Sequence, residues 1–551
     1  MSSSTSSPTA PGLLGELCRG RVRWDLLRPF PEHDPADRAV GDRVVAELTA
    51  LLHEHVDPEA VDRAAALPDG LVERLRAGGF LSLTMSPDLG GLDLSPMNTV
   101  RLIVAAASWC VPVAWMLAIS NGFGAGTYLP LLADGPLKEL VTEHVKAGSL
   151  SGSADTEVGG AANETRATTA VLVEDGAAYR LTGEKIFIGN APSAGLVDVS
   201  ATVRVDGVDQ VRIFFVPTDL PGVEVGGAQE FLGLKGSSVG VLRFDDVRVP
   251  AEYLLPTTED SWRAEPALVR IAIMARMLVI ASPALAIARL CLSWQRDFVR
   301  RRQMDGRALG DYEEVQRIVA RSAAEVFAME SLVEWGMLGA DLGAKVPEFT
   351  AAKNLMSLAC WRVVDSTLSL LAGEGFETAT SKARRGAAPL PVERAFRDAR
   401  GLRVAGGVDF LLDYWSGLAL IDGAEAGSLS AEDPALTGAC AEHLCALGAE
   451  AARFAVLRAR LHEQAGQHEV VIAGQIAGGL LSMAVTLARA AHLAERGDPG
   501  ALDLADIACV DERQRLAAAW SELDRDREPD YAAMSKDLLH GDGLERVIGH
   551  G

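Results

Sequence analysis

Cysteine and aromatic residues are scarce in this sequence. Seven cysteines and 5% aromatic residues occur among 551 positions, and the cysteines form neither a CxxC pair nor a recurring spacing. Such sparse thiols do not predict a disulfide framework. We expect them to be free in a reducing compartment, with the protein in the cytoplasm.

Basic residues are in deficit too. Lysine and arginine number 52 against 75 acidic residues, which gives a formal net charge of -23. A general nucleic-acid binder needs a basic face for phosphate contacts, so we expect no nucleic-acid partner. An anionic ligand stays open, because arginines cluster between Arg296 and Arg307.

Long apolar runs are also missing. The most apolar one, Met277 to Ala288, lies between two arginines and is far shorter than the roughly 20 residues of a transmembrane helix. The opening MSSSTSSPTAPG lacks the basic start and the apolar core of a signal peptide. We therefore expect no transmembrane segment, and we predict that residues 1–37 are a disordered leader or arm.

The sequence does contain ample apolar material, 48% of all residues, in a chain too long for one hydrophobic core. Apolar residues recur at helical spacing in residues 38–145, and strand signals with frequent glycine follow in residues 146–256. Helical spacing returns in residues 257–425 and continues, after a polar break, in residues 426–551. These patterns predict a mainly α fold with an inserted β domain.

The clearest strand signals lie near the middle of the chain. Apolar residues alternate from Val197 to Val203 and again from Val211 to Phe215, with Asp206-Gly207 between them as a hairpin signal. A second alternating pair is predicted further on, with Leu242 and Phe244 in one segment and Val247 and Val249 in the next.

Several motifs resemble those of the acyl-CoA dehydrogenase flavoprotein superfamily. They are SPDLGGLDLS (86–95), TEVGGAAN (156–163), TGEKIFIGN (182–190), LKGSSVGVLRFDDVRVPAEYLL (234–255), RRQMDGRALGDYEEVQ (301–316), AGEGF (372–376) and PVERAFRDARGLRV (391–404). Their order and spacing match the family, and residues 426–551 resemble the extra helical domain of very-long-chain acyl-CoA dehydrogenases.

The resemblance implies a fold and a cofactor. The fold has an N-terminal helical domain, a middle β-barrel-like domain, a C-terminal four-helix bundle and, here, an additional C-terminal helical domain. FAD lies between the sheet and the bundle and is held partly by a neighbouring subunit, so we expect a homodimer or a dimer of dimers. The substrate implied is an acyl thioester, carried by CoA or by an acyl carrier protein and packed against the flavin.

The resemblance also implies which residues contact FAD. Phe187 stacks beside the ring, and Arg301 and Gln303 reach the partner's FAD, where a guanidinium suits a pyrophosphate. The full set of implied cofactor-binding positions is Thr156, Ala161, Ala162, Phe187, Ile188, Gly189, Arg301, Gln303, Met304, Ser369 and Gly373.

The sequence departs from the family at its catalytic base. In the family a glutamate removes the α-proton while a hydride leaves the β-carbon, and it usually stands directly after the R-D-x-R run. Gly406 occupies that position here, and Ala275 occupies the alternative position on an earlier helix. A general base must be within hydrogen-bond reach of the proton, and neither residue has a carboxylate. Ordinary α,β-desaturation is therefore not predicted.

The flavin surroundings depart as well. Gly189 replaces the threonine that faces flavin N5, and Ala162 and Asn163 replace a serine and an aspartate. Ser369 replaces a glutamine, and Met304 replaces a phenylalanine. We interpret these changes as specialisation or as decay of the site.

Some polar groups remain available. The Gly406 N–H can polarise a thioester carbonyl without any side chain, and Thr156 keeps its place beside the ring. Asp155 is a candidate for a relocated acid or base, or else a solvated or capping aspartate. Asp409 is a weaker candidate, and Glu374 is predicted to face solvent.

Three hypotheses follow for function. The first is an FAD-dependent oxidoreductase that acts on an acyl thioester by a non-standard route, including reduction of an enoyl thioester. The second is a flavin-dependent monooxygenase of the same superfamily. The third is a catalytically inactive homologue that serves as a scaffold or subunit partner. No metal site is predicted.

Overall fold

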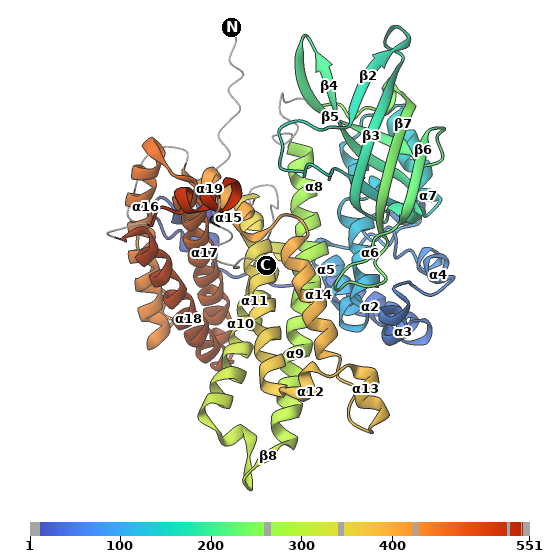
Figure 1. Ribbon diagram of the computed structural model, residues 1–551. Coiled ribbons are helices and arrows are strands. Elements are labelled where there is room, and N and C mark those ends of the chain that lie inside the picture. Colours follow the sequence, from blue (N-terminus) through green and yellow to red (C-terminus); the bar gives the residue numbers. More distant parts are fainter. Residues whose placement is uncertain are drawn as a thin grey trace.

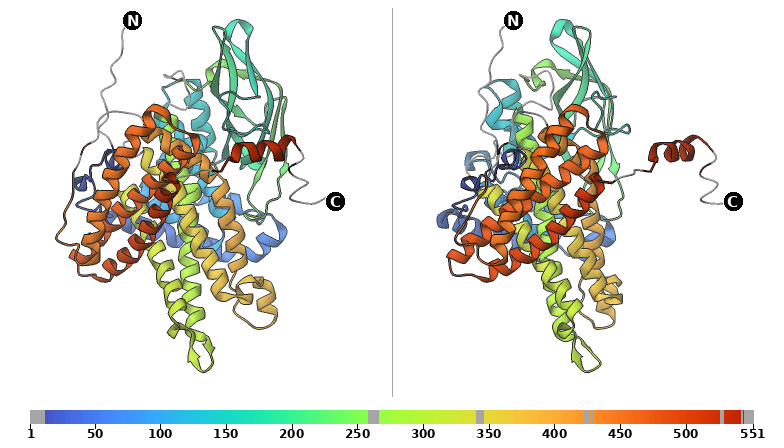
Figure 2. Two further views of the ribbon diagram at one scale, coloured as in Figure 1. Left: turned by 60° about the vertical axis from the view of Figure 1, so that its left-hand side comes forward. Right: turned by 90° about the vertical axis from the view of Figure 1, so that its left-hand side faces the viewer.

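The computed structural model describes residues 12–257, 266–339, 346–421, 427, 429–525, 529–541 and 543. Helices come first along the chain, a β-sheet follows, and helices make up the rest (Figure 1). The sheet stands at one end of the molecule, and the last long helices lie beside the central ones (Figures 1 and 2). The predicted fold class, mainly α with an inserted β domain, is confirmed.

The N-terminal helices begin where the sequence supplies caps. The Asp34 carboxylate accepts hydrogen bonds from the N–H groups of Ala36 and Asp37, and the Ser95 hydroxyl caps a later helix. A proline follows each cap, where its missing N–H costs nothing. The helices are α2 Pro35–His55, α3 Pro58–Ala64, α4 Leu71–Ala77, α5 Pro96–Trp109, α6 Val111–Gly122 and α7 Pro136–Lys146.

The segment before these helices packs against the rest of the protein. Helix α1 (Leu13–Leu17) buries Leu13, Leu14 and Leu17, and the Leu14 N–H donates to Glu348 Oε1 at 2.8 Å. Residues 12–37 therefore form an ordered arm, not a disordered leader. The first part of the predicted leader, residues 1–11, lies outside the described residues.

The middle of the chain forms a seven-stranded mixed sheet. Its order is β1-β4-β2-β3-β7-β6, with β5 paired to β4. The strands are β1 Leu150–Ala154, β2 Thr169–Val173, β3 Ala178–Gly189, β4 Ala194–Val205, β5 Val208–Pro217, β6 Val223–Ala228 and β7 Val239–Pro250. The predicted hairpin is confirmed, because β4 and β5 are antiparallel and Val205 pairs with Val208 across Asp206-Gly207.

The second predicted strand pair is wrong. Leu242, Phe244, Val247 and Val249 belong to one strand, β7, which pairs with β3 along its whole length. Asp246 has a φ of 49°, and the register of the two strands shifts at this point. Asp245 and Asp246 form a β-bulge. The same polar residues could form a turn, but a bulge lets the strand continue.

A buried ion pair holds the second half of strand β3 to the segment that follows β1. Lys185 Nζ donates to Glu157 Oε1 at 2.7 Å, and both side chains are buried. Burial opposes ionisation of Glu157, but hydrogen bonds from Lys185 and Thr168 outweigh it and lower the pKa of this carboxyl to about 2. The pair therefore fixes β3 to the segment that carries Thr156.

The helical bundle follows the sheet. Its elements are α8 Pro266–Arg276, α9 Ser282–Arg301, β8 Gln303–Met304, β9 Arg307–Ala308, α10 Glu313–Leu338, α11 Val346–Leu371, α12 Gly373–Phe376, α13 Ala379–Arg384, α14 Val392–Val404 and α15 Asp409–Ile421. A π-helical turn, Met277–Ala281, joins α8 to α9 without a break. Such turns insert one extra residue and are frequent at functional sites.

The additional C-terminal helices are α16 Ala439–Gln464, α17 Gln467–Glu495, α18 Gly500–Leu523 and α19 Tyr531–His540. Helices α16, α17 and α18 pack on this bundle, whereas α19 buries none of its residues and stands apart from it (Figure 2). Helices α15 and α17 approach closely at two glycines. A Cβ on Gly417 would lie 2.1 Å from Val470 O, and one on Gly474 would lie 2.0 Å from Asp413 O. The seven cysteines are free, as predicted.

Three helical stretches are long and apolar enough to span a membrane, judged by length and composition alone: Ile271–Arg301, Val392–Ile421 and Gln467–Glu495. This corrects the expectation drawn from uninterrupted apolar runs. In the first and third stretches, 83% of the most apolar window is buried inside the protein, so helix packing accounts for its composition. The second, 33% buried, comprises α14 and α15 with Gly406 and Gly407 between them.

Candidate functional site

The end of strand β3 presents an exposed aromatic ring. Phe187 is 53% exposed, has a φ of 58°, and donates its N–H to Gln229 Oε1 at 2.9 Å. Its ring lies 6.0 Å from the ring of Phe231, centroid to centroid, while the next residue, Ile188, is buried. An exposed flat ring beside a second aromatic side chain suits stacking against a planar cofactor.

Gly189 follows directly and has no room for a side chain. A Cβ at this position would lie 2.4 Å from Cδ1 of Ile119 on helix α6. Ile119 therefore fills the space that a side chain at position 189 would enter, and this end of the strand is lined by an apolar group.

We expect Gly189→Thr to lower the free energy of unfolding by about 1–3 kcal/mol, because it overpacks a buried contact. Ile119→Ala removes the obstructing side-chain atoms. Threonine at position 189 should therefore lower the free energy of unfolding less in the Ile119→Ala background than in the unmodified protein. Urea unfolding of the four proteins measures the coupling. Strictly additive effects would show that Ile119 does not exclude the side chain.

The segment before the sheet core carries the other predicted ring contacts. The Thr156 carbonyl accepts a hydrogen bond from the Ile186 N–H at 2.9 Å, so Thr156 is bound to strand β3. Ala161 and Ala162 follow in the turn after Glu157. This part of the site is therefore assembled within one chain.

Asp155 is engaged in the sheet. Its Oδ1 accepts hydrogen bonds from Arg166 Nε at 2.8 Å and from the Ser200 hydroxyl at 2.6 Å. The Arg166 side chain is fully buried, and the Asp155 side chain is 32% exposed. The carboxylate thus neutralises a buried arginine, a structural duty that competes with any role as a relocated base.

The remaining predicted cofactor contacts lie at the opposite end of the bundle from the sheet. Arg301 ends α9, Gln303 and Met304 form β8, and Ser369 and Gly373 lie around the start of α12. Figure 1 shows β8 and α12 far from β3. Within one chain, the two groups of predicted FAD contacts are therefore far apart.

Glu374 does not face solvent as predicted. Its side chain is 14% exposed and forms an ion pair with Arg301 Nη2. The pair links two motifs that are far apart in the sequence, and it neutralises the arginine that the resemblance assigns to a pyrophosphate.

Gly406 lies in a short loop between α14 and α15. Its φ of 71° and that of Gly407, 107°, belong to the left-handed region that favours glycine. A Cβ on Gly406 would meet only Ile280 Cγ1, at 3.8 Å, within 4 Å. No acceptor among the described residues takes the Gly406 N–H. The position therefore offers space and a free backbone donor.

A buried lysine braces this loop. Lys353 Nζ, on α11, donates to Gly407 O at 2.7 Å and to Arg403 O at 3.1 Å. The side chain is fully buried, and burial lowers its pKa to about 8. Lys353 was not among the predicted site residues, although a lone lysine inside the apolar helix Val346–Leu371 is a signal that the sequence contains.

A chain of amides continues from the loop to the additional domain. Asn354 Nδ2 donates to Asp409 O at 2.8 Å and to Asp413 Oδ1 at 2.7 Å, and Gln475 Nε2 on α17 donates to Asp413 Oδ2 at 3.3 Å. Burial raises the pKa of Asp413 to about 6. Asp409 pairs with Arg403, Nε to Oδ2 at 3.0 Å, so this weaker candidate base is already neutralised.

The alternative glutamate position is also filled without a carboxylate. Ala275 on α8 is fully buried, and a Cβ on Gly122 of α6 would lie 3.0 Å from its Cα. The close approach of these two helices leaves Ala275 inside the core.

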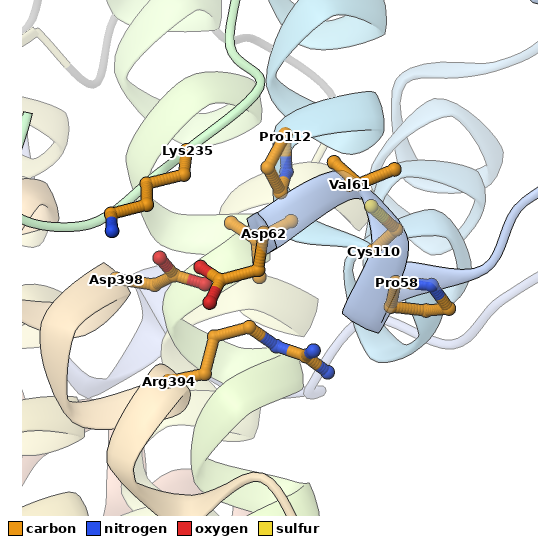
Figure 3. A pocket seen from close by; sticks show the side chains of 9 residues that line it. Pro58, Val61, Asp62, Cys110, Pro112, Lys235, Arg394 and Asp398 are labelled. Atoms are coloured by element: carbon orange, nitrogen blue, oxygen red, sulfur yellow. The ribbon is translucent and has the colours of Figure 1, made fainter. Parts of the chain in front are cut away.

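Two hollows lie outside this region. One, with a volume of ≈ 10 Å³, holds about one water and is lined by charged groups that include Asp62, Lys235, Arg394 and Asp398 (Figure 3). The other, of ≈ 960 Å³, lies between α2, α5, α9, α10 and α17, and its Arg289 and Arg489 are paired with glutamates. None of the predicted flavin contacts lines either hollow.

A helical domain, a sheet with an exposed aromatic strand end and a helical bundle, in this order, define a flavoprotein of the acyl-CoA dehydrogenase type. Models of the acyl-CoA dehydrogenase N-terminal, middle and C-terminal domains match residues 42–136, 152–247 and 270–410. The chain belongs to the acyl-CoA dehydrogenase family.

Relatives and solved structures agree. A probable acyl-CoA dehydrogenase, FadE10 of Mycobacterium tuberculosis, is 30% identical over 400 residues, 72% of this chain and 61% of that protein. The human short-chain specific acyl-CoA dehydrogenase is 27% identical over 62% of this chain and 79% of its own length. A Bacillus anthracis acyl-CoA dehydrogenase in complex with FAD superposes with a TM-score of 0.76 at 18% identity, covering 98% of this chain and 96% of the other. The chain thus spans less than two thirds of the FadE10 relatives but nearly all of this structure.

The cofactor of this family is FAD. The residues of this chain fit it at the sheet, where the Phe187 ring is exposed beside Phe231 and Thr156 is bound to the same strand.

Proposed function

We propose that the protein is an FAD-dependent oxidoreductase that acts on an acyl thioester, carried by CoA or by a carrier protein, without a carboxylate at position 406. The open space and the free N–H at Gly406 are the observation that carries this proposal. The space beside Gly406 supports this proposal, because position 406 has no side chain to remove the α-proton.

The chain's own residues bind and polarise in this scheme. Phe187 stacks beside the flavin, and Ile119 keeps water from the end of the strand near Gly189. The Gly406 N–H donates to the thioester carbonyl and stabilises the negative charge that develops there. FAD, when bound, supplies the capacity to accept or deliver a hydride.

Two subunits would complete one cofactor site. Arg301, Gln303, Met304, Ser369 and Gly373 lie far from Phe187 within one chain (Figure 1). They would therefore serve the FAD of a partner, in a homodimer or a dimer of dimers. Arg301 would exchange Glu374 for the cofactor's pyrophosphate, a bidentate acceptor.

The proposal is tested with purified full-length protein. It predicts one FAD for each chain and a change in the flavin absorbance when a saturated or an enoyl thioester is added without oxygen. Protein that takes up no FAD contradicts the proposal and supports an inactive homologue. Thioester-dependent oxygen consumption by the reduced protein would instead support the monooxygenase.

Removal of Arg301 tests the shared site. We expect Arg301→Ala to weaken FAD retention by about tenfold, since it loses a charged hydrogen-bond donor to the pyrophosphate. Arg296→Ala is the matched control, because that arginine is exposed on the same helix and pairs only with Asp297. Fluorescence titration of the deflavinated proteins with FAD measures both. Equal retention in the two variants would remove Arg301 from the site.

A further inference from the structure

Positive charge exceeds negative charge around Lys353, which braces the Gly406 loop through Gly407 O. Three cations, Arg276, Lys353 and Arg403, lie near one another, with the carboxylates Asp409 and Asp413. Arg403 pairs with Asp409, while Asp413 is held by the amides of Asn354 and Gln475. A glutamate at position 406 would give three carboxylates against the three cations. Without it, one positive charge is uncompensated.

Arg276 forms no ion pair with any carboxylate of the described residues. Its Nη1 donates to the Thr350 hydroxyl at 3.0 Å. The side chain is partly buried, and desolvation lowers its pKa. Removing a charge from water is costly unless an opposite charge compensates, so an anion at this place would be stabilised.

Arg276 and the residue nearest to the vacancy lie on the same stretch of helix. Arg276 ends α8, and Ile280, in the π-helical turn that follows, is the residue nearest to the Cβ position of Gly406, at 3.8 Å. Lys353 holds the other side of the loop through Gly407 O. An anion beside Gly406 would therefore lie among positive groups, with room for it.

We propose that the space beside Gly406 receives a carboxylate carried by the substrate on its α-carbon, and that Arg276 binds it. The substrate class is then a 2-carboxyacyl thioester, of the malonyl type. This inference rests on the proposed function, because position 406 faces the α-carbon only if the thioester binds as in the family. A carboxylate on that carbon would reach the space that the glutamate side chain leaves.

Such a substrate does not need a base. Its bond between the α-carbon and the carboxylate breaks, CO₂ leaves, and the electron pair stays on the α-carbon as a thioester enolate that the Gly406 N–H stabilises. With oxidised flavin as the hydride acceptor, the products are an enoyl thioester, CO₂ and reduced flavin, so atoms and charge balance. Loss of CO₂ thus replaces loss of the α-proton.

Binding of three matched ligands tests the inference. FAD-loaded full-length protein, with its flavin reduced so that it cannot accept a hydride, is titrated by stopped flow with butylmalonyl-CoA, hexanoyl-CoA and adipyl-CoA, so that binding is measured before CO₂ is lost. We expect butylmalonyl-CoA to bind at least about tenfold more tightly than hexanoyl-CoA. With oxidised flavin, one CO₂ should appear for each flavin reduced by butylmalonyl-CoA.

Three variants locate the effect. Arg276→Gln, which keeps a donor for Thr350, should lose the preference for butylmalonyl-CoA. Arg289→Gln, an exposed position on the adjoining helix, should keep it. Gly406→Glu should lose the preference too, because its own carboxylate fills the space, and this variant does not depend on the folding of Arg276→Gln.

The possible outcomes separate the two proposals. Equal affinity for butylmalonyl-CoA and hexanoyl-CoA, or tighter binding of adipyl-CoA than of both, overturns the 2-carboxyacyl inference and leaves the proposed function intact. A preference that survives in Arg276→Gln overturns the assignment to Arg276. Failure to bind FAD overturns the proposed function itself, and failure to bind all three thioesters overturns it for CoA-bound substrates.

Discussion

A Gly406→Glu variant is expected to reduce its bound FAD with a saturated acyl thioester at least about 10²-fold faster than the unmodified protein, since general bases contribute roughly 10²–10⁴-fold. The vacancy at Gly406 accepts a Cβ whose nearest neighbour is Ile280 Cγ1 at 3.8 Å. The new carboxylate would enter a region with surplus positive charge, which keeps it ionised and able to remove a proton. Stopped-flow absorbance of the flavin under anaerobic conditions measures the rate.

The gain has a structural cost. Gly406 has a φ of 71°, and a side chain in this conformation costs roughly 1–2 kcal/mol. Gly406→Gln is the matched control, because it carries the same strain and nearly the same volume without a base. Both variants should melt below the unmodified protein, and only Gly406→Glu should gain the reaction. A glutamine variant that gains as much would show that filling the space, not proton removal, limits the rate.

The sequence predicted the order of domains because their periodicities differ. The apolar residues that alternate from Val197 to Val203 and from Val211 to Phe215 predicted a strand pair. Asp206-Gly207 placed the turn between them, where Val205 pairs with Val208. The break predicted between Phe244 and Val247 is wrong, because two aspartates look alike in a turn and in a bulge. The local sequence does not show whether a neighbouring strand continues beside the two aspartates, as β3 does here.

The site was less accessible to sequence analysis. Motif resemblance placed Gly406 and Phe187, since these positions follow fixed patterns. The ion pair between Arg301 and Glu374 joins residues 73 positions apart, and the packing of α9 against α11, which α12 follows, brings them together. Asp155 likewise acquires its partner, Arg166, through the fold of the sheet.

The second large effect concerns Lys353, the brace of the Gly406 loop. We expect Lys353→Met to lower the free energy of unfolding by about 2–5 kcal/mol, because the carbonyls of Gly407 and Arg403 would each lose a buried hydrogen-bond donor. Methionine keeps most of the volume, so cavity formation adds little. Lys138→Met is the control, since that lysine is exposed and pairs with Asp134 on the surface, where ion pairs contribute about 0–1 kcal/mol.

The pH dependence of the free energy of unfolding shows whether Lys353 titrates in the folded protein. The pKa of Lys353 is about 8 in the folded protein against 10.5 as the ordinary value, so the unfolded chain binds more protons between these values. The free energy of unfolding of the unmodified protein should therefore rise across this interval relative to Lys353→Met. A neutral amine still has two N–H groups for its two carbonyl acceptors, so the brace survives deprotonation. If the difference between the two proteins stays constant from neutral pH to above pH 10, Lys353 does not titrate while folded. If Lys353→Met unfolds like Lys138→Met, the loop at Gly406 is held by the Asn354 amide and the Arg403–Asp409 ion pair without Lys353.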